Sequence, residues 1–110
     1  MQASEYVNEV LRTLDNPSKA KASLGMHIAC MTLGLTGEAG EVADIIKKHI
    51  WHDHPLDREA LKKELGDVLW YLVAISELYG ISLDEVMQSN IAKLRKRYPD
   101  GFDVNKSINR

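Results

Sequence analysis

Apolar residues recur along this chain at intervals of three and four, the spacing that gathers them on one face of an α-helix. No alternating apolar and polar run persists, and no Asn-Gly or Asp-Gly turn joins two apolar runs. The pattern predicts four helices, over residues 4–14, 23–51, 58–79 and 82–98, followed by a polar tail at 99–110. The predicted fold is an all-α helical bundle formed by a single domain, residues 1–110.

The ends of the predicted helices coincide with residues that start or stop helices. Ser23 and Asp57 are candidate N-caps, and Ser82 with Glu85 forms a capping box. Gly80 follows the third helix, at the position where a left-handed residue commonly ends a helix. Three prolines separate the helices, at Pro17, Pro55 and Pro99.

Composition narrows the class of protein. The chain has 110 residues and a net charge of −2, with 45% hydrophobic and 27% charged residues, which is typical of one globular domain. So small a net charge argues against a nucleic-acid-binding surface and against a polybasic membrane anchor. The longest charge-free run, residues 22–37, is too short and too polar to span a bilayer.

Two further expectations follow from size and cysteine content. A chain this small buries only about two-thirds of its unfolded surface, so its long helices are expected to need a partner subunit. The single cysteine, Cys30, excludes an internal disulfide and a thiolate zinc site, and it is expected to be a packed core thiol. A lone thiol and no secretory signal predict a cytoplasmic protein.

The acidic residues are distributed less evenly than the net charge suggests. Residues 22–46 contain no Lys or Arg, and residues 64–92 contain none either. The first stretch holds Glu38 and Glu41, and the second holds Glu64 and Asp67. Each pair is spaced i,i+3, so its members share a helix face. Because a short connection joins the two helices, they are expected to pack antiparallel and to bring the four carboxylates together.

Converging carboxylates repel one another, and a cation or protonation relieves that repulsion. Hard oxygen ligands without cysteine indicate Mg²⁺, with Mn²⁺ as a substitute. The alternative is that all four acids face solvent on ordinary amphipathic helices. Glycines surround the acids and indicate close helix approach or room for a ligand, although small-residue packing alone would also explain them: Gly34, Gly37, Gly40 and Gly66.

Two segments of the chain, GLTGEAGEVAD at 34–44 and ELGDVLWYL at 64–72, resemble MazG-like nucleotide pyrophosphohydrolases. That family is marked by Glu-x-x-Glu, a spacer, and Glu-x-x-Asp, and here the spacer is residues 42–63. The likeness covers roughly residues 23–102 and includes the ending from Asn90-x-x-Lys93 to Arg97-Tyr98-Pro99. All four acidic positions of the pattern are intact.

The resemblance implies an all-α, metal-dependent enzyme that cleaves a nucleoside triphosphate between its α and β phosphates. The products would be the monophosphate and pyrophosphate, and the biological role would be removal of unwanted nucleotides. Members act as homo-dimers or homo-tetramers with the site near subunit contacts. The metal ligands would be Glu38, Glu41, Glu64 and Asp67, with Glu38 or Glu41 as the general base.

Further side chains are candidates for substrate binding. Asn90, Lys93 and Arg97 share one helix face, and the resemblance favours phosphate binding over a simple cationic last turn. Lys48 and Tyr71 lie on the helix faces of the acids and are candidates for phosphate and nucleoside contacts, with surface solvation and core packing as alternatives. Weaker candidates are Trp51 and Trp70 for stacking and His27 as a base or sugar contact.

One further candidate metal site and two rival functions remain. His49, His52 and His54 would form a zinc or nickel site, but a histidine-rich helix end is the favoured interpretation. A carboxylate-bridged redox bundle needs Glu-x-x-His pairs, and none follows the acids of the motif. A non-catalytic helical oligomerisation or interaction module remains open, and it predicts that the acids tolerate replacement.

Overall fold

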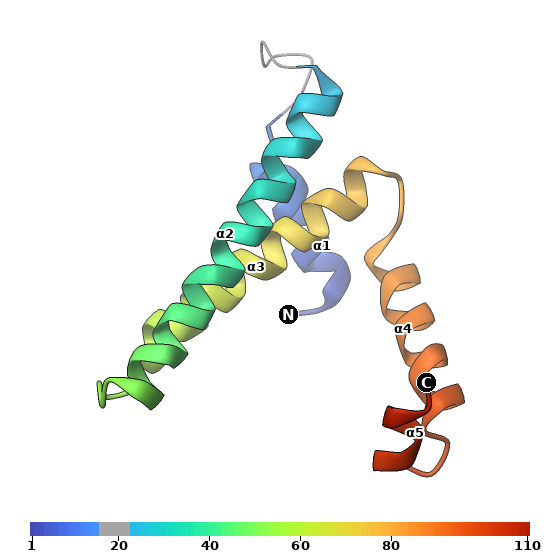
Figure 1. The fold of residues 1–110 in the computed structure, drawn as a ribbon. Coiled ribbons are helices and arrows are strands. Elements are labelled where there is room, and N and C mark those ends of the chain that lie inside the picture. The colour runs from blue at the N-terminus through green and yellow to red at the C-terminus, as the bar shows by residue number, and fades with distance from the viewer. Residues whose placement is uncertain (16–22) are drawn as a thin grey trace.

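A computed structural model describes residues 1–15 and 23–110 of the chain, and those residues form helices and connecting segments without strands. The helices are α1 (Ala3–Thr13), α2 (Leu24–Trp51), α3 (Arg58–Leu78), α4 (Leu83–Arg97) and α5 (Val104–Ile108) (Figure 1). The all-α prediction is confirmed. No helix of the described part is long and apolar enough to cross a membrane. The predicted stop at Pro17 lies outside the described residues.

Helix starts are fixed by the capping residues that the sequence indicated. The Ser23 hydroxyl accepts a hydrogen bond from the Met26 amide at 3.3 Å, and the Asp57 carboxylate accepts one from the Ala60 amide at 3.0 Å. At α4 the Glu85 amide donates to the Ser82 hydroxyl at 3.1 Å, and the Ser82 amide donates to the Glu85 carboxylate at 2.8 Å. Local hydrogen bonds therefore determine where the helices begin.

The predicted polar tail requires a correction, because it contains α5. The Asp103 carboxylate caps this helix by accepting a hydrogen bond from the Lys106 amide at 3.1 Å. Gly101 has φ +96°, a left-handed conformation that costs glycine little, and it allows the chain to turn back after α4. The tail therefore returns beside the end of α4 (Figure 1).

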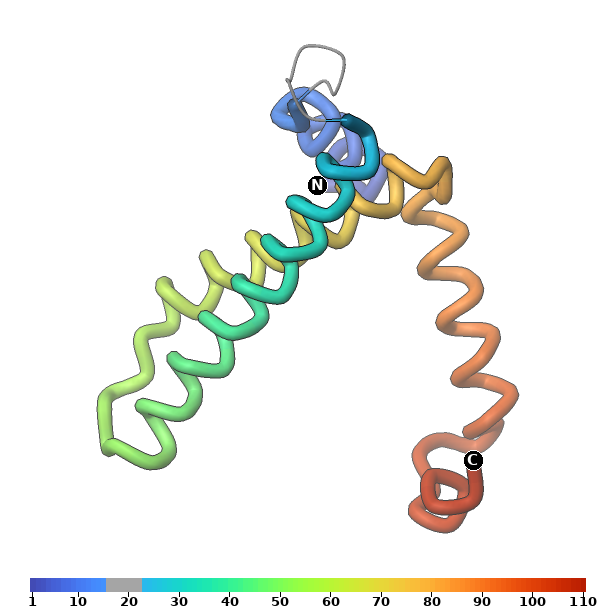
Figure 2. The backbone as a smooth tube through the Cα atoms, turned by 45° about the horizontal axis from the view of Figure 1, so that its top comes forward, coloured from blue at the N-terminus to red at the C-terminus, as the bar shows by residue number. Residues whose placement is uncertain are grey.

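Helices α2 and α3 form a long antiparallel hairpin, as the short connection predicted, and α1 packs against it (Figure 2). The buried core lies where α1 meets α3 and consists of Val10, Val73 and Ala74, with Met31 and Trp70 packed around it. Beyond the end of α3 the chain turns, and α4 and α5 diverge from the hairpin (Figures 1 and 2). The hairpin and the α4–α5 arm thus form two separate projections of one chain.

A large apolar surface is left uncovered by the chain itself. Its accessible surface is 8429 Å², whereas a compact monomer of this mass exposes about 6,100 Å². On α3, the side chains of Leu65, Leu69 and Leu72 are 51%, 41% and 38% exposed. Since these leucines are spaced i, i+4 and i+7, they form one apolar stripe on the outer face of α3. The stripe faces away from the core of the same chain.

Of the glycines around the acids, Gly34 is the one that close helix packing requires. A Cβ atom built there would lie inside 3.0 Å of ring carbons of Tyr71, whereas at Gly37, Gly40 and Gly66 it would meet nothing within 4 Å. Among these four glycines, Gly34 is therefore the position where α2 lies in close contact with a side chain of α3.

Gly34→Ala is expected to destabilise the protein, by about 1–3 kcal/mol, because the Tyr71 ring must move to admit a methyl group. Gly40→Ala is the matched control and should be neutral or stabilising by up to about 1 kcal/mol, because alanine is the better helix former. Urea denaturation of both variants measures the difference. Equal stabilisation by the two alanines would show that the ring and α2 are not in close contact.

Candidate metal centre and adjoining cavity

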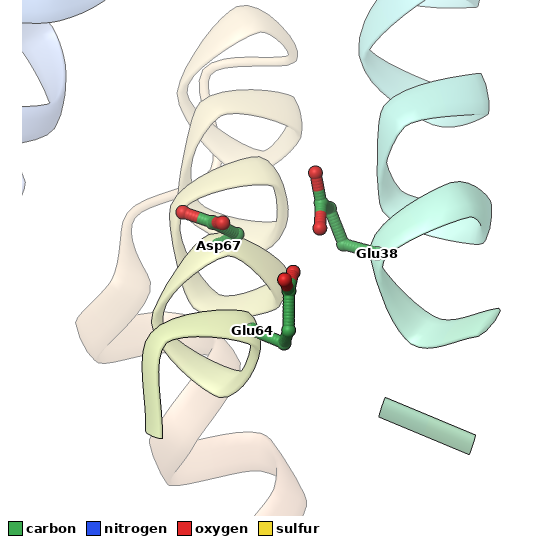
Figure 3. Close-up of side chains that lie close together, drawn as sticks. All are labelled: Glu38, Glu64 and Asp67. Carbon is green, nitrogen blue, oxygen red and sulfur yellow. The ribbon is translucent and has the colours of Figure 1, made fainter. Parts of the chain in front are cut away.

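Three carboxylates meet at the middle of the α2–α3 hairpin. Glu38 projects from α2 toward Glu64 and Asp67, which project from successive turns of α3 (Figure 3). One oxygen from each side chain lies within 4.8 Å of the others, and all three residues are partly buried. The i,i+3 spacing of Glu64 and Asp67 places both on the α3 face opposite Glu38. The structure thus brings together three of the four acids of the predicted site.

The neighbouring acids of this cluster raise the pKa of Glu38. A hydrogen bond with the Glu64 carboxyl, desolvation, and the charges of Glu64, Asp67 and Glu41 raise the pKa of Glu38 to about 7. The ion pairs of the described residues join Arg12 to Glu9, Lys47 and Lys48 to Asp44, and Lys62 to Glu59. None of them neutralises the acid cluster, so its negative charge is left for a proton or a cation to balance.

The donor set fits a hard divalent cation. All three ligands are carboxylate oxygens, the type that such ions prefer. Oxygens that surround Mg²⁺ at its usual bond length lie roughly 3.0–4.2 Å apart, and the oxygens of Glu38, Glu64 and Asp67 fall within 4.8 Å of one another. Small side-chain movements would therefore close the cluster around an ion.

Glu41 and Lys48 lie on α2 outside the acid cluster. The Glu41 side chain is exposed one turn beyond Glu38, and it acts on the cluster through its charge, as a minor cause of the raised Glu38 pKa. The Lys48 ammonium instead pairs with Asp44 at 2.7 Å, and this bond raises the Lys48 pKa and lowers that of Asp44. The structure therefore separates both residues from the three converging carboxylates.

A cavity of about 450 Å³ adjoins the acid cluster, lined by Thr13, Glu38, Asp67, Trp70 and Tyr71. The rings of Trp70 and Tyr71 pack edge to face with their centroids 5.1 Å apart. The Trp70 indole N–H donates to the Thr13 hydroxyl at 2.8 Å, which ties α1 to α3. Thr13 was not among the sequence candidates, because nothing in the pattern of α1 places it beside the acids.

The α4 candidates do not reach the acid cluster within one chain. Figure 2 shows α4 diverging from the hairpin that carries the acids. Lys93 and Arg97 instead line a separate cavity with residues of α5, and Asn90 is exposed on α4. Within the part of the chain that the structure describes, the acids and these α4 side chains therefore form separate sites (Figure 2).

Three other residues singled out in the sequence, Cys30, His27 and Trp51, are not part of the acid cluster. Cys30 is exposed in this chain, which corrects the expectation of a packed core thiol: no helix of the described part covers its side of α2. His27 is buried at 6% exposure, and both ring nitrogens lack a hydrogen-bond partner among the described residues. Trp51 is 79% exposed at the end of α2.

The three histidines near the hairpin turn occupy the end of α2. The His49 ring nitrogen Nδ1 hydrogen-bonds the His54 carbonyl at 2.8 Å, and the rings of His52 and His54 pack edge to face with centroids 6.2 Å apart. Within the part of the chain that the structure describes, the acid cluster is the group whose ligand atoms converge for a metal. The histidines thus close the turn between the two long helices.

Glu38→Gln is expected to change how stability depends on pH when metal is removed by a chelator. The Glu38 pKa rises on folding from 4.5 to about 7, so wild-type stability should fall as pH increases through that interval. The neutral glutamine removes this term, so the variant should overtake the wild type at the upper end of the window. Mg²⁺ should then raise the melting temperature of the wild type more than that of the variant. Parallel pH profiles of the two proteins would contradict the assignment.

Comparison with known proteins places these features in a family. The model of the MazG nucleotide pyrophosphohydrolase domain matches residues 27–102. The gene 37 protein of Mycobacterium phage L5 is 34% identical over 87 residues, which cover 76% of each chain. The uncharacterized protein YvdC of Bacillus subtilis is 34% identical over 73 residues, 58% of this chain and 69% of that protein.

A third relative has a named activity. Human dCTP pyrophosphatase 1 is 35% identical over 78 residues, 63% of this chain and 44% of that protein. The chain therefore matches less than half the length of this relative. No solved structure gives a significant match.

Proposed function

Because this chain belongs to the MazG nucleotide pyrophosphohydrolase family, we propose that it hydrolyses a nucleoside triphosphate between the α and β phosphates in a Mg²⁺-dependent reaction. The products are the nucleoside monophosphate and pyrophosphate, and the role is removal of unwanted nucleotides. The convergence of Glu38, Glu64 and Asp67 within 4.8 Å carries this proposal, because the negatively charged triphosphate needs a cation to approach such a cluster.

In the proposed site, Glu38, Glu64 and Asp67 hold Mg²⁺, and Mn²⁺ can replace it. Bound there, the ion would polarise the phosphoryl oxygens and make a bound water more acidic. Glu41, one helical turn from Glu38, either completes the ligand set or stays free. The general base is Glu38 or Glu41, and of the two the exposed Glu41 carboxylate is the more open to a water.

The nucleoside is assigned to the cavity beside the acid cluster. Trp70 and Tyr71 offer aromatic surface there, and the hydrogen bond from Trp70 to Thr13 keeps the indole in place. The phosphates are assigned to Asn90, Lys93 and Arg97, with Lys48 as a further contact once its ion pair with Asp44 rearranges. Because α4 lies apart from the hairpin, these α4 residues would come from another copy of the chain.

A homo-dimer or homo-tetramer is therefore part of the proposal. The exposed surface exceeds the monomer expectation by about 2,300 Å², which is ample for a stable interface on each chain. The leucine stripe of α3, Leu65, Leu69 and Leu72, supplies an apolar face of the kind that subunit contacts bury.

Pyrophosphate release from a panel of ribo- and deoxyribonucleoside triphosphates, with and without Mg²⁺, tests the function. At least one nucleotide should be cleaved to its monophosphate, and a chelator should abolish the reaction. An interaction module without catalytic activity would release pyrophosphate from none of them, and that result would refute the enzymatic proposal.

A further inference from the structure

A second cavity, of about 510 Å³, lies between the last turns of α4 and the short helix α5. Five cationic side chains line it: Lys93, Lys96, Arg97, Lys106 and Arg110. Two amides complete the lining, Asn105 of α5 and Asn109 at its C-cap. The cavity thus combines the basic end of α4 with a helix to which the sequence motifs assigned no role.

Within the described residues, these cations pair with no acid. No carboxylate of residues 1–15 or 23–110 lies within 4.0 Å of their charged groups. Asp103, the acid at the start of α5, is engaged in capping through the Lys106 amide at 3.1 Å. The five charges contribute +5 to a chain of net charge −2, which leaves −7 on the remainder. Positive charge is therefore concentrated at one concave place on an otherwise acidic molecule.

The turn between α4 and α5 brings the two helices side by side (Figure 1). The Gly101 amide donates to the Tyr98 carbonyl at 3.2 Å, and Gly101 takes the left-handed conformation that this reversal needs. The rings of Tyr98 and Phe102 pack with centroids 5.4 Å apart, and the Arg97 guanidinium lies 5.9 Å from the Tyr98 ring centre. These contacts order the turn after which α5 lies beside the end of α4 (Figure 1).

We propose that the segment after α4 extends the phosphate-binding end of that helix. Lys106 of α5 and Arg110, two residues beyond α5, line the same cavity as the α4 cations and join them in binding a polyphosphate chain. Guanidinium and ammonium groups with amide donors suit phosphate oxygens, and several clustered cations suit an anion of three or four charges. The volume admits one small ligand, and the acidic remainder of the chain disfavours a nucleic acid strand. The anion is either the triphosphate of the substrate or free pyrophosphate. This part of the inference rests on the proposed function.

Calorimetric titration with pyrophosphate in a chelator tests the site without turnover, because the acid cluster repels this anion when no cation is present. Lys106→Gln/Arg110→Gln should weaken binding about tenfold or more, since each lost contact is a charged hydrogen bond. Arg58→Gln/Lys62→Gln removes the same two charges from the exposed start of α3 and should leave affinity unchanged. Equal weakening by both pairs would overturn the proposal, because it would show a general charge effect.

Three further measurements on the wild type keep the test decisive if the α5 variant folds poorly. Pyrophosphate should protect Lys96 and Lys106 of the wild type from acetylation, and unprotected lysines would refute the site. A nucleotide with a methylene bridge between the α and β phosphates distinguishes the sources: tighter binding than pyrophosphate assigns the site to substrate, and equal binding assigns it to free polyphosphate. Preferential binding of a single-stranded oligonucleotide would overturn the small-anion assignment.

Failure of this inference and failure of the proposed function are separable. If the protein hydrolyses nucleotides but the Lys106→Gln/Arg110→Gln variant binds pyrophosphate as tightly as the wild type, only this inference is refuted. A protein that cleaves no nucleotide, yet binds pyrophosphate through α5, refutes the enzymatic proposal and leaves the polyphosphate site standing.

Discussion

Glu64→Gln and Asp67→Asn are each expected to lower the rate of pyrophosphate release by about 100-fold or more. Either change removes a carboxylate charge from a cluster of three whose oxygens converge within 4.8 Å. A divalent ion supplies several kcal/mol of transition-state stabilisation, and each 1.36 kcal/mol corresponds to about tenfold in rate. Both substitutions preserve side-chain shape, so the helices and the packing of the hairpin should be retained.

Glu59→Gln is the matched control for these variants. Glu59 lies on the same helix, but it is exposed and pairs with Lys62 at 2.8 Å, away from the acid cluster. Initial rates with the preferred nucleotide, measured over a range of Mg²⁺ concentrations, should show normal activity for this control. The two cluster variants should need more Mg²⁺ for whatever activity remains. Wild-type rates in both cluster variants would exclude a catalytic role for the three acids.

Leu69→Asp is expected to convert an oligomer into single chains and to abolish most of the activity. Leu69 lies at the centre of the α3 leucine stripe and is 41% exposed in one chain. An unpaired carboxylate buried at a subunit contact costs several kcal/mol, so association should weaken by about 100-fold or more. Activity should fall with it, because the α4 side chains proposed to bind phosphate must come from another copy.

Analytical ultracentrifugation measures this result directly. The wild type should sediment as two or four chains of 12.4 kDa, and Leu69→Asp as one. Leu69→Met keeps the apolar volume and should remain assembled, since such swaps cost little. Circular dichroism checks that the variant keeps its helices, as expected for a side chain outside the core. An active wild-type monomer would refute both the assembly and the shared site.

The acid cluster shows how far sequence patterns reach into the site. Spacing i,i+3 placed Glu64 and Asp67 on one face of α3, and both do point toward α2 (Figure 3). Glu41 has the same spacing from Glu38, but its side chain is exposed and lies outside the cluster, so the spacing alone does not decide which acids converge. Two acids can thus share a helix face without both reaching the same metal site.

Other features depended on contacts that are distant in sequence. Thr13 reaches the cavity because Trp70, fifty-seven residues away, donates to its hydroxyl. Cys30, expected to be buried among apolar neighbours, is exposed because no described helix covers that side of α2. Hydropathy reports how apolar a segment is, but it does not report which face another segment will cover.

By itself, the sequence determined the four longer helices, the capped starts of α2, α3 and α4, and the pairing of acids along each long helix. These features arise from hydrogen bonds and side-chain spacings within about four residues, so they depend only on the local sequence. The tertiary structure decided which acids converge, where α4 points, and that α5 lines a cationic cavity together with α4. Those outcomes depend on the burial of apolar surface between distant helices, and part of that surface, the α3 leucine stripe, still faces outward in a single chain.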